Sequence, residues 1–198
     1  MISPELLLLY GAEKNTFLKD AFVFREDEAA RYYHQIELGE VKMCNYSENG
    51  KEFIQGIFSG GRCFGEPPLF VDFNYPSNAI AITDSAIWQL PKEAFLTLIK
   101  DHPEIHFKIT ASISARLHYK AIMAQEISHE DPRHRILRLL NYLKTDIYKH
   151  TKKYSYKVEL TRQQIADLTG LRVETAIRAI KKLEKEGYIK IEKRKIRI

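Results

Sequence analysis

A segment near the C-terminus combines basic side chains with apolar residues at helical spacing. Residues 161–187 read Thr-Arg-Gln-Gln-Ile-Ala-Asp-Leu-Thr-Gly-Leu-Arg-Val-Glu-Thr-Ala-Ile-Arg-Ala-Ile-Lys-Lys-Leu-Glu-Lys-Glu-Gly. Apolar positions recur on both sides of Gly170, which predicts a short helix, a tight turn and a longer helix sharing one core, the pattern of a helix-turn-helix. The other faces carry Arg172, Glu174, Arg178, Lys181 and Lys182. Packing alone does not require so much positive charge, so the segment predicts binding to duplex DNA.

Charge is divided unevenly along the chain. Residues 1–131 hold 12 basic and 19 acidic groups, whereas residues 132–198 hold 19 basic and 7 acidic groups. Basic groups that face phosphates release counterions and give affinity without sequence preference. The asymmetry therefore indicates a polyanionic partner for the C-terminal part. A pure protein-interaction module would not explain this excess of positive charge.

Length and composition fit an ordinary globular protein. With 198 residues, 44% of them hydrophobic, the chain suits one large or two small domains. The apolar run at residues 6–9 is too short to span a membrane and follows no basic residues, so we expect neither a membrane helix nor a signal peptide. Cys44 and Cys63 could form one disulfide, but nothing else suggests secretion. We expect reduced thiols in a cytoplasmic protein with no membrane partner.

The N-terminal part reads as short strands separated by turns. Gly39, Asn49-Gly50 and Gly60-Gly61 provide the turn signals. The β-favouring stretches between and after them are residues 32–36, 41–46, 52–58 and 79–83. Several strands at this spacing predict a sandwich or a barrel.

After Lys92 the apolar pattern takes a helical period. A first helix should stop before Pro103, and a long one should run over about 103–128 with proline at its first position. Its apolar stripe consists of Ile105, Ile109, Ile113 and Leu117, followed by Ala121 and Ala124. The stripe could pack on the chain's own barrel or on a symmetry mate. The length of the helix favours a dimer.

The C-terminal part begins at a hinge, Glu130-Asp131-Pro132. An amphipathic helix should run from Pro132 to near Lys149, and residues 154–160 alternate as a strand. Residues 189–192 and 195–198 alternate again around the basic turn Lys193-Arg194. This predicts a β-ribbon behind the second helix of the motif, as in a winged helix-turn-helix.

A barrel, a long connecting helix and a winged helix-turn-helix together resemble the cyclic-AMP receptor / fumarate-nitrate regulator family of bacterial transcription factors. Two motifs support the likeness: residues 161–178, and Phe64-Gly65-Glu66, which is similar to the glycine-glutamate element of the family's ligand loop. The resemblance implies an α+β fold in three parts. Residues 1–102 would form a jelly-roll effector barrel (a double-stranded β-helix, cyclic-nucleotide-binding-like), residues 103–131 the dimerisation helix and hinge, and residues 132–198 the winged helix-turn-helix.

The resemblance also assigns roles in DNA binding. Arg178 is similar to the arginine that reads guanine bidentately, and Glu174 to the glutamate that accepts from the cytosine amino group. The backbone-contact positions are Thr161, Arg162, Gln163, Arg172 and Thr175, and we add Lys181, Lys193 and Arg194 for their charge. From spacing alone, an ordinary i,i+4 surface ion pair between Glu174 and Arg178 is the better interpretation, and only the matched recognition helix favours base contacts.

Two positions indicate the subtype. Cyclic-AMP receptors have a second arginine where this chain has Val173, so the motif looks more like the fumarate-nitrate regulator type. That type has a serine where this chain has Ile177, which cannot donate a hydrogen bond but could contact a thymine methyl. We expect a half-site with a G·A core and leave its flanking bases open.

The ligand loop departs from that of cyclic-AMP binders. Those proteins pair the cyclic phosphate with an arginine where Tyr75 or Pro76 stands, and residues 64–79 hold no basic residue. A buried phosphate without its counter-charge is strongly disfavoured, so we expect no cyclic AMP binding in the usual geometry. The candidate pocket residues are Gly65, Glu66, Tyr75, Ser77, Asn78, Arg116 and Lys120. An anion in a remodelled pocket could still use Arg116 or Lys120.

Other chemistry has weaker support. Two cysteines cannot hold a four-thiolate iron–sulfur cluster. Haem ligands are available in His34, Cys44, Cys63, His102, His106 and His118, although single histidines are usually structural. His102 and His106, spaced i,i+4, lack an evident third metal ligand. A cupin-like enzyme would need clustered histidines, and the barrel region has only His34.

The predicted protein is thus a homodimeric, sequence-specific DNA-binding transcriptional regulator rather than an enzyme, with no certain cofactor. The resemblance implies RNA polymerase as a partner and a small-molecule effector that the sequence does not identify. The alternative is the same DNA-binding output gated by a non-nucleotide ligand, such as haem or an anionic metabolite.

Overall fold

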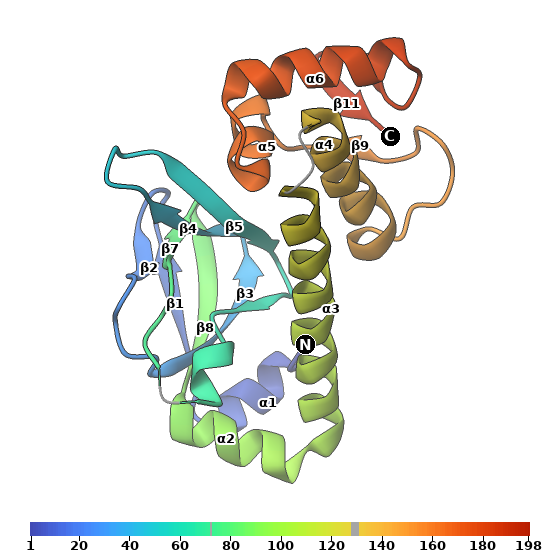
Figure 1. Cartoon of the computed structure of the whole chain (residues 1–198). Helices are drawn as coiled ribbons and strands as arrows, with labels where there is room; N and C mark the ends of the chain where they lie inside the picture. The colour runs from blue at the N-terminus through green and yellow to red at the C-terminus, as the bar shows by residue number, and fades with distance from the viewer. Residues whose placement is uncertain (72, 128–130) are drawn as a thin grey trace. The chain divides into compact units, whose positions relative to one another are not determined.

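The computed structural model describes residues 1–71, 73–127 and 131–198, without the side chains of residues 126 and 127. Three positions named in the sequence analysis lie outside the described residues: Asp72 in the predicted ligand loop, Ser128 at the predicted end of the long helix, and Glu130 in the predicted hinge. The chain forms two compact units, Met1–Ser114 and Ala115–Ile198, which we treat separately (Figure 1).

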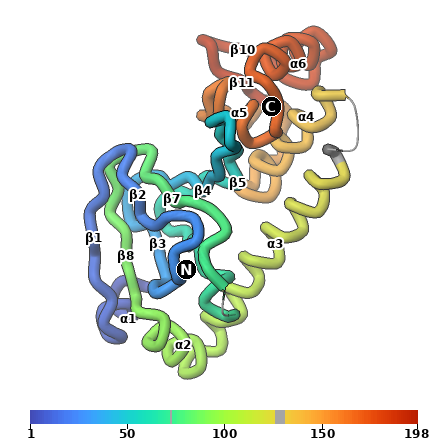
Figure 2. The backbone as a smooth tube through the Cα atoms, turned by 60° about the vertical axis from the view of Figure 1, so that its left-hand side comes forward, coloured from blue at the N-terminus to red at the C-terminus, as the bar shows by residue number. Residues whose placement is uncertain are grey.

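Two antiparallel sheets form the N-terminal unit within the described residues (Figure 2). One has the order β1-β8-β3-β6 and the other β2-β7-β4-β5. Their bounds are β1 Glu13–Phe17, β2 Phe22–Phe24, β3 Tyr32–Leu38, β4 Glu40–Tyr46, β5 Glu52–Ser59, β6 Cys63–Phe64, β7 Asn78–Ala81 and β8 Ser85–Pro91. A short 3₁₀ turn, Pro67–Leu69, follows β6. The predicted strands are all present, whereas β1, β2, β6 and β8 had not been predicted.

Side chains from both sheets fill the barrel with aromatic and aliphatic groups. This cluster comprises Phe24, Ile36, Val41, Phe58, Phe64, Tyr75, Ala79 and Ile87. A second cluster, with the single tryptophan Trp88, lies under α1 (Pro4–Leu9) and α2 (Lys92–Asp101). Burial of these groups is the main stabilising contribution to the unit.

The long helix α3 spans Pro103–Ile127, as predicted from its apolar period. Ile105 and Ile109 are buried in the second cluster and Ile113 packs on it, whereas Leu117 is 67% exposed. The predicted stripe is therefore divided: its first half covers the chain's own barrel. Its second half is exposed and continues a row of exposed residues spaced three and four apart along α3: Phe107, Thr110, Ser114, Leu117, Ala121 and Ala124.

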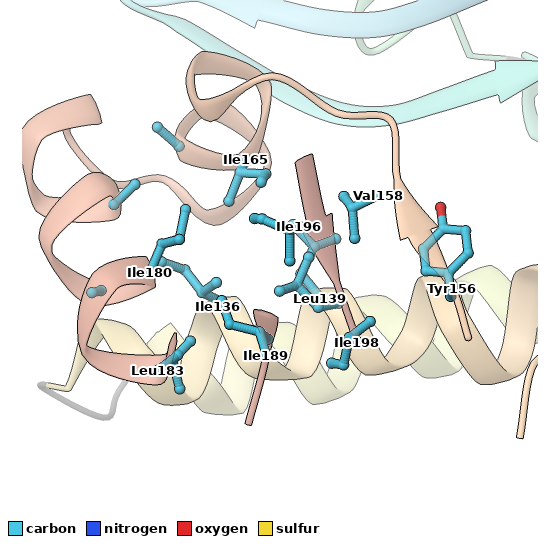
Figure 3. Packing of buried hydrophobic residues seen from close by; sticks show 14 residues of the cluster. Ile136, Leu139, Tyr156, Val158, Ile165, Ile180, Leu183, Ile189, Ile196 and Ile198 are labelled. Atoms are coloured by element: carbon cyan, nitrogen blue, oxygen red, sulfur yellow. The ribbon is translucent and has the colours of Figure 1, made fainter. Parts of the chain in front are cut away.

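The C-terminal unit begins within α3, at Ala115, and packs further helices on a small sheet of order β10-β11-β9. The elements are α4 Pro132–Asn141, the π-helical turn η2 Tyr142–Ile147, β9 Lys157–Val158, α5 Arg162–Thr169, α6 Val173–Lys185, β10 Lys190–Glu192 and β11 Lys195–Arg197. Figure 3 shows side chains of α4, α5, α6 and the sheet converging on one core, with Ile136, Ile165, Ile180 and Ile196 at its centre. The winged helix-turn-helix predicted from periodicity is confirmed.

Two predicted elements differ in detail. The helix from Pro132 continues to Ile147, but its last part widens into the π-helical turn. The strand predicted for residues 154–160 is reduced to Lys157–Val158. Tyr154 has φ +58°, a left-handed conformation that interrupts an extended strand. Tyr156 still exchanges two backbone hydrogen bonds with Ile198.

Candidate nucleic-acid interface and ligand pocket

The start of α5 is fixed by a capping box. The Thr161 hydroxyl accepts from the Gln164 N–H at 3.1 Å, and the Gln164 side chain accepts from the Thr161 N–H at 2.8 Å. The exposed Gln163 side chain donates to the buried Asp167 carboxylate at 2.8 Å, and Arg162 is half-buried. These residues therefore present a helix N-terminus, a position that suits a phosphate.

The turn between α5 and α6 depends on Gly170. Its φ of 67° and ψ of 18° place it in the left-handed region, where glycine avoids the steric cost of a side chain. The chain then reaches the exposed Arg172 at the N-cap of α6, and Val173, which packs on the core. The turn thus sets the angle between α5 and α6.

One face of α6 is exposed and carries the predicted base-reading side chains. Glu174, Arg178 and Lys181 are exposed, while Thr175 is half-buried. Ile177 lies on the same face with 37% exposure. Within the described chain, no ion pair joins Glu174 to Arg178, so the surface-pair interpretation gains no support. Both side chains are available to a partner.

The wing brings further basic groups to the same unit. Lys193 and Arg194 form its tip, with φ values of 47° and 65°, as a two-residue hairpin turn requires. Lys157, Lys195 and Arg197 line a groove of about 770 Å³ beside it, together with Glu192 and Lys193. Sequence reasoning missed Lys157, Lys195 and Arg197 because their proximity depends on the pairing of β9 with β11.

Charge pairing restrains this groove. Glu159 accepts from Lys157 at 2.8 Å and from Lys195 at 2.9 Å, and Glu192 accepts from Arg197 at 2.7 Å. These exposed pairs contribute little stability. The lysines and the arginine can therefore exchange their carboxylate partners for phosphates at small cost.

The glycine-glutamate element is covered by aromatic rings. A Cβ on Gly65 (φ +69°) would lie 2.8 Å from the Phe24 ring and 3.3 Å from the Tyr75 ring. The Phe24 and Tyr75 rings stack at 3.6 Å between centroids with 9° between their planes. Glu66 is fully buried, and its carboxylate accepts from the Cys63 thiol at 3.2 Å. The interior beside Gly65 is therefore occupied by the protein's own side chains.

Of the seven predicted pocket residues, the structure shows Gly65 beside the Tyr75 ring, while the others have different neighbours. Tyr75 and Ser77 are buried, and burial raises the pKa of the Tyr75 hydroxyl. The Asn78 amide donates to the Cys44 carbonyl at 3.3 Å and accepts from the Glu26 N–H at 3.1 Å. Arg116 and Lys120 lie one turn apart on α3 in the C-terminal unit, where burial and the Arg116 charge lower the pKa of Lys120.

The other candidate ligands are dispersed. His34 is buried, and Cys44 and Cys63 are buried thiols that are not joined in a disulfide; burial raises the pKa of Cys44 to about 12. The i,i+4 spacing of His102 and His106 suggested that both lie on one helix, but His102 is the C-cap of α2, ahead of Pro103. His106 stacks on Phe70. Over the described residues there is no group of three His, Cys, Asp or Glu side chains able to hold a metal, and no helix long and apolar enough to cross a membrane.

Comparisons with known proteins match both units. The cyclic nucleotide-binding domain family matches residues 14–102, and the Crp-like helix-turn-helix domain family matches residues 134–198. The cAMP-activated global transcriptional regulator CRP of Haemophilus influenzae is 27% identical over 172 residues, which cover 86% of this chain and 76% of that protein.

Two solved structures share the fold. The c-di-GMP responsive global regulator CLP of Xanthomonas campestris has a TM-score of 0.76 at 22% identity, covering 97% of this chain and 96% of that one. CprK complexed with OCPA has a TM-score of 0.77 at 20% identity, covering 99% and 91%. These named ligands differ from one relative to the next, so the shared fold does not identify an effector.

Proposed function

Because this chain belongs to the cyclic-AMP receptor / fumarate-nitrate regulator (CRP/FNR) family and is a DNA-binding transcription factor rather than an enzyme, we propose that it binds a palindromic DNA site sequence-specifically as a homodimer. We also propose that it acts in the cytoplasm with RNA polymerase. Cyclic AMP does not gate it in the usual geometry.

The observation that carries the proposal is the exposed face of α6. Arg178 fits the O6/N7 pair of guanine, and Glu174 accepts from the cytosine amino group, so each of these two contacts reads a G–C pair. The adenine of the proposed G·A core comes from the family resemblance. Thr161, Arg162, Gln163, Arg172 and Thr175 set the register on the backbone. Lys181 and the wing residues Lys193 and Arg194 add phosphate contacts.

The exposed residues of α3 support the homodimer. Phe107 is 81% exposed and Leu117 67% exposed, and with the small residues of the same spacing they repeat as the a and d positions of a coiled coil. Two such helices packed together would cover the apolar groups. To read successive major grooves of a palindrome, the two recognition helices of the dimer would have to lie about 34 Å apart, one turn of the DNA duplex.

The covered glycine-glutamate element supports independence from cyclic AMP. A nucleotide beside Gly65 would have to displace the Phe24–Tyr75 stack, and residues 64–79 would offer its phosphate no cation. A non-nucleotide ligand acting elsewhere in the barrel is the alternative. If that ligand is haem, the purified protein should show an absorbance band in the region where haem absorbs.

Fluorescence anisotropy tests the proposal directly. The full chain is titrated onto a palindrome with G·A-core half-sites and onto a scrambled duplex, with and without cyclic AMP. We expect tight binding of the palindrome without nucleotide and at least ~1,000-fold weaker binding of the scrambled duplex. Equal binding of both duplexes would contradict sequence-specific recognition. Preference that appears only with cyclic AMP would contradict the interpretation of the ligand loop.

A further inference from the structure

The loop after β6 and its 3₁₀ turn exposes three large apolar side chains. Phe70, Val71 and Phe73 are 38, 48 and 50% exposed. Apolar residues scattered singly over a surface are ordinary, whereas several together mark a site of interaction with another molecule. Segment 64–79 holds no basic residue, so this surface suits an apolar partner rather than a phosphate.

Contacts within the N-terminal unit hold this loop in place. Leu69 is 1% exposed, and its N–H donates to the Glu66 carbonyl at 3.0 Å. The Phe70 N–H donates to the Pro67 carbonyl at 3.2 Å, and the Phe70 ring meets the Phe95 ring edge-on with 5.8 Å between centroids. The surface is therefore formed before a partner arrives, and binding would cost little ordering entropy.

The loop borders the exposed row of α3, which begins at Phe107. The Phe70 ring stacks on the His106 ring with 6.1 Å between centroids and 13° between planes. Successive residues of an α-helix are about 100° apart around its axis, which places His106 between the buried Ile109 and the exposed Thr110. Phe107, 81% exposed, lies at the opposite edge of the row. The loop and Phe107 thus flank the row from its two sides.

The exposed row alone is a small interface. Stable interfaces bury about 800 Å² per partner, with roughly 20–30 residues a side. The row has six residues, and four of them are small: Thr110, Ser114, Ala121 and Ala124. The homodimer therefore needs more apolar surface beside the row, and the loop with Phe70, Val71 and Phe73 provides it.

Two-fold symmetry decides which surfaces meet. The proposed homodimer pairs two α3 helices in parallel, as in a two-stranded coiled coil. Each edge of the row then faces the opposite edge of the row in the second copy, because a half-turn relates the two helices. The His106 edge of one copy, with Phe70 stacked on it, meets Phe107 of the second copy. The same contact occurs twice in the dimer.

We propose that Phe70, Val71 and Phe73 dock on α3 of a second copy of this chain, around its Phe107. The inference rests on the proposed homodimer and names the contacts that complete it. The predicted ligand loop then joins the two copies through apolar burial, so the dimer forms without a small-molecule ligand.

Analytical ultracentrifugation of the full chain tests the docking surface. Val71→Ser and Phe73→Ser should each weaken the dimer at least ~10-fold, because each removes an apolar contact twice. Leu9→Ser should not, since Leu9 is 77% exposed on α1 of the same unit, outside the loop. A dimer as strong in both loop variants as in the parent would overturn the inference and leave the homodimer standing. A monomeric parent would overturn both and point to a different protein as the occupant.

A crosslink identifies the contact itself. Chains with Phe107→Cys are mixed under mild oxidation with chains carrying Val71→Cys, Phe73→Cys or, as the control, Leu9→Cys. One chain of each pair carries a tag, so that the mixed covalent dimer is resolved by its mass.

Only the introduced thiols react, because the native Cys44 and Cys63 are buried. We expect the mixed dimer with Val71→Cys or Phe73→Cys, since a disulfide needs Cβ atoms about 4 Å apart. Leu9→Cys should give none. Absence of the mixed dimer with both loop variants would overturn the inference, as would a mixed dimer that forms equally with Leu9→Cys.

Discussion

The exposed face of α6 and the surroundings of Gly65 both carry a family motif, but they present it in opposite ways. On α6, Glu174 and Arg178 are exposed with no ion pair between them in the described chain. At Gly65, the Phe24 and Tyr75 rings cover the element, and Glu66 is buried against Cys63. A motif retains a binding role only where its neighbours leave it accessible. The face of α6 is therefore open to DNA, whereas the glycine-glutamate element is covered by the protein's own side chains.

The strongest test of this contrast is Arg178→Ala. A bidentate arginine–guanine pair gives about 1–3 kcal/mol of discrimination, and a homodimer uses two, so anisotropy on the palindrome should show roughly 100-fold weaker binding. Binding to the scrambled duplex should change little and should remain salt-sensitive, because phosphate contacts supply it.

Lys185→Ala is the matched control for Arg178. Lys185 is also an exposed cation of α6, but it lies in the last turn, away from the N-terminal residues that contact bases in such motifs. It should retain full discrimination. If Arg178→Ala still prefers the palindrome as strongly as the parent, the base-reading role assigned to α6 is wrong.

Sequence periodicity predicted the accessible region well. The apolar spacing around Gly170 and the alternation of residues 189–198 depend on local geometry, so α5, α6 and the wing could be predicted without tertiary information. The short strands β2 and β6 could not, because strands of three and two residues are defined by their partners β7 and β3. The place of Lys157 in the groove could not be predicted either, since Lys157 reaches the wing only through the pairing of β9 with β11.

The surroundings of Gly65 were beyond sequence reasoning for a related reason. The missing basic residue in residues 64–79 was visible, but the ring that takes its place was not. Tyr75 stacks on Phe24, which is 51 residues away in the chain, and no local pattern predicts that contact. The sequence suggested His34 only as a possible haem or metal ligand, because its hydrogen bond to Gln89, which in turn bonds to Asn15, depends on β3 and β1 both pairing with β8.

Acid should destabilise the two units over different pH ranges. Burial lowers the pKa of His34 from about 6.5 to about 3. The contribution of the neutral imidazole to the free energy of unfolding is therefore complete above pH ~6.5. It is lost as pH falls towards ~3, at up to ~1.4 kcal/mol per pH unit. In the C-terminal unit, hydrogen bonds from Arg133 lower the pKa of Asp131 to about 2. That contribution is lost only between pH ~4 and ~2, so the barrel should loosen first.

Trp88 reports this transition, because the single tryptophan lies in the N-terminal unit. Its fluorescence should shift on acidification at a higher pH than the far-ultraviolet circular dichroism of the helices changes. His34→Gln keeps a polar partner for Gln89 and should move the Trp88 transition to lower pH. His106→Gln, at an exposed histidine of the same unit, should not. Identical Trp88 transitions in the parent and His34→Gln would show that the buried imidazole does not control barrel stability.

The smallest effect concerns Ile177, the apolar member of the α6 face. At 37% exposure between Glu174 and Arg178, its side chain can contact a thymine methyl in the major groove. Replacing half-site thymines one at a time with deoxyuridine removes only that methyl. We expect one position to weaken binding about 4-fold, which corresponds to ~0.8 kcal/mol for one buried methyl group. In Ile177→Ala the same replacement should have less effect, because two interacting groups do not contribute additively. If the parent tolerates deoxyuridine at every position, α6 reads its site through Glu174 and Arg178 alone.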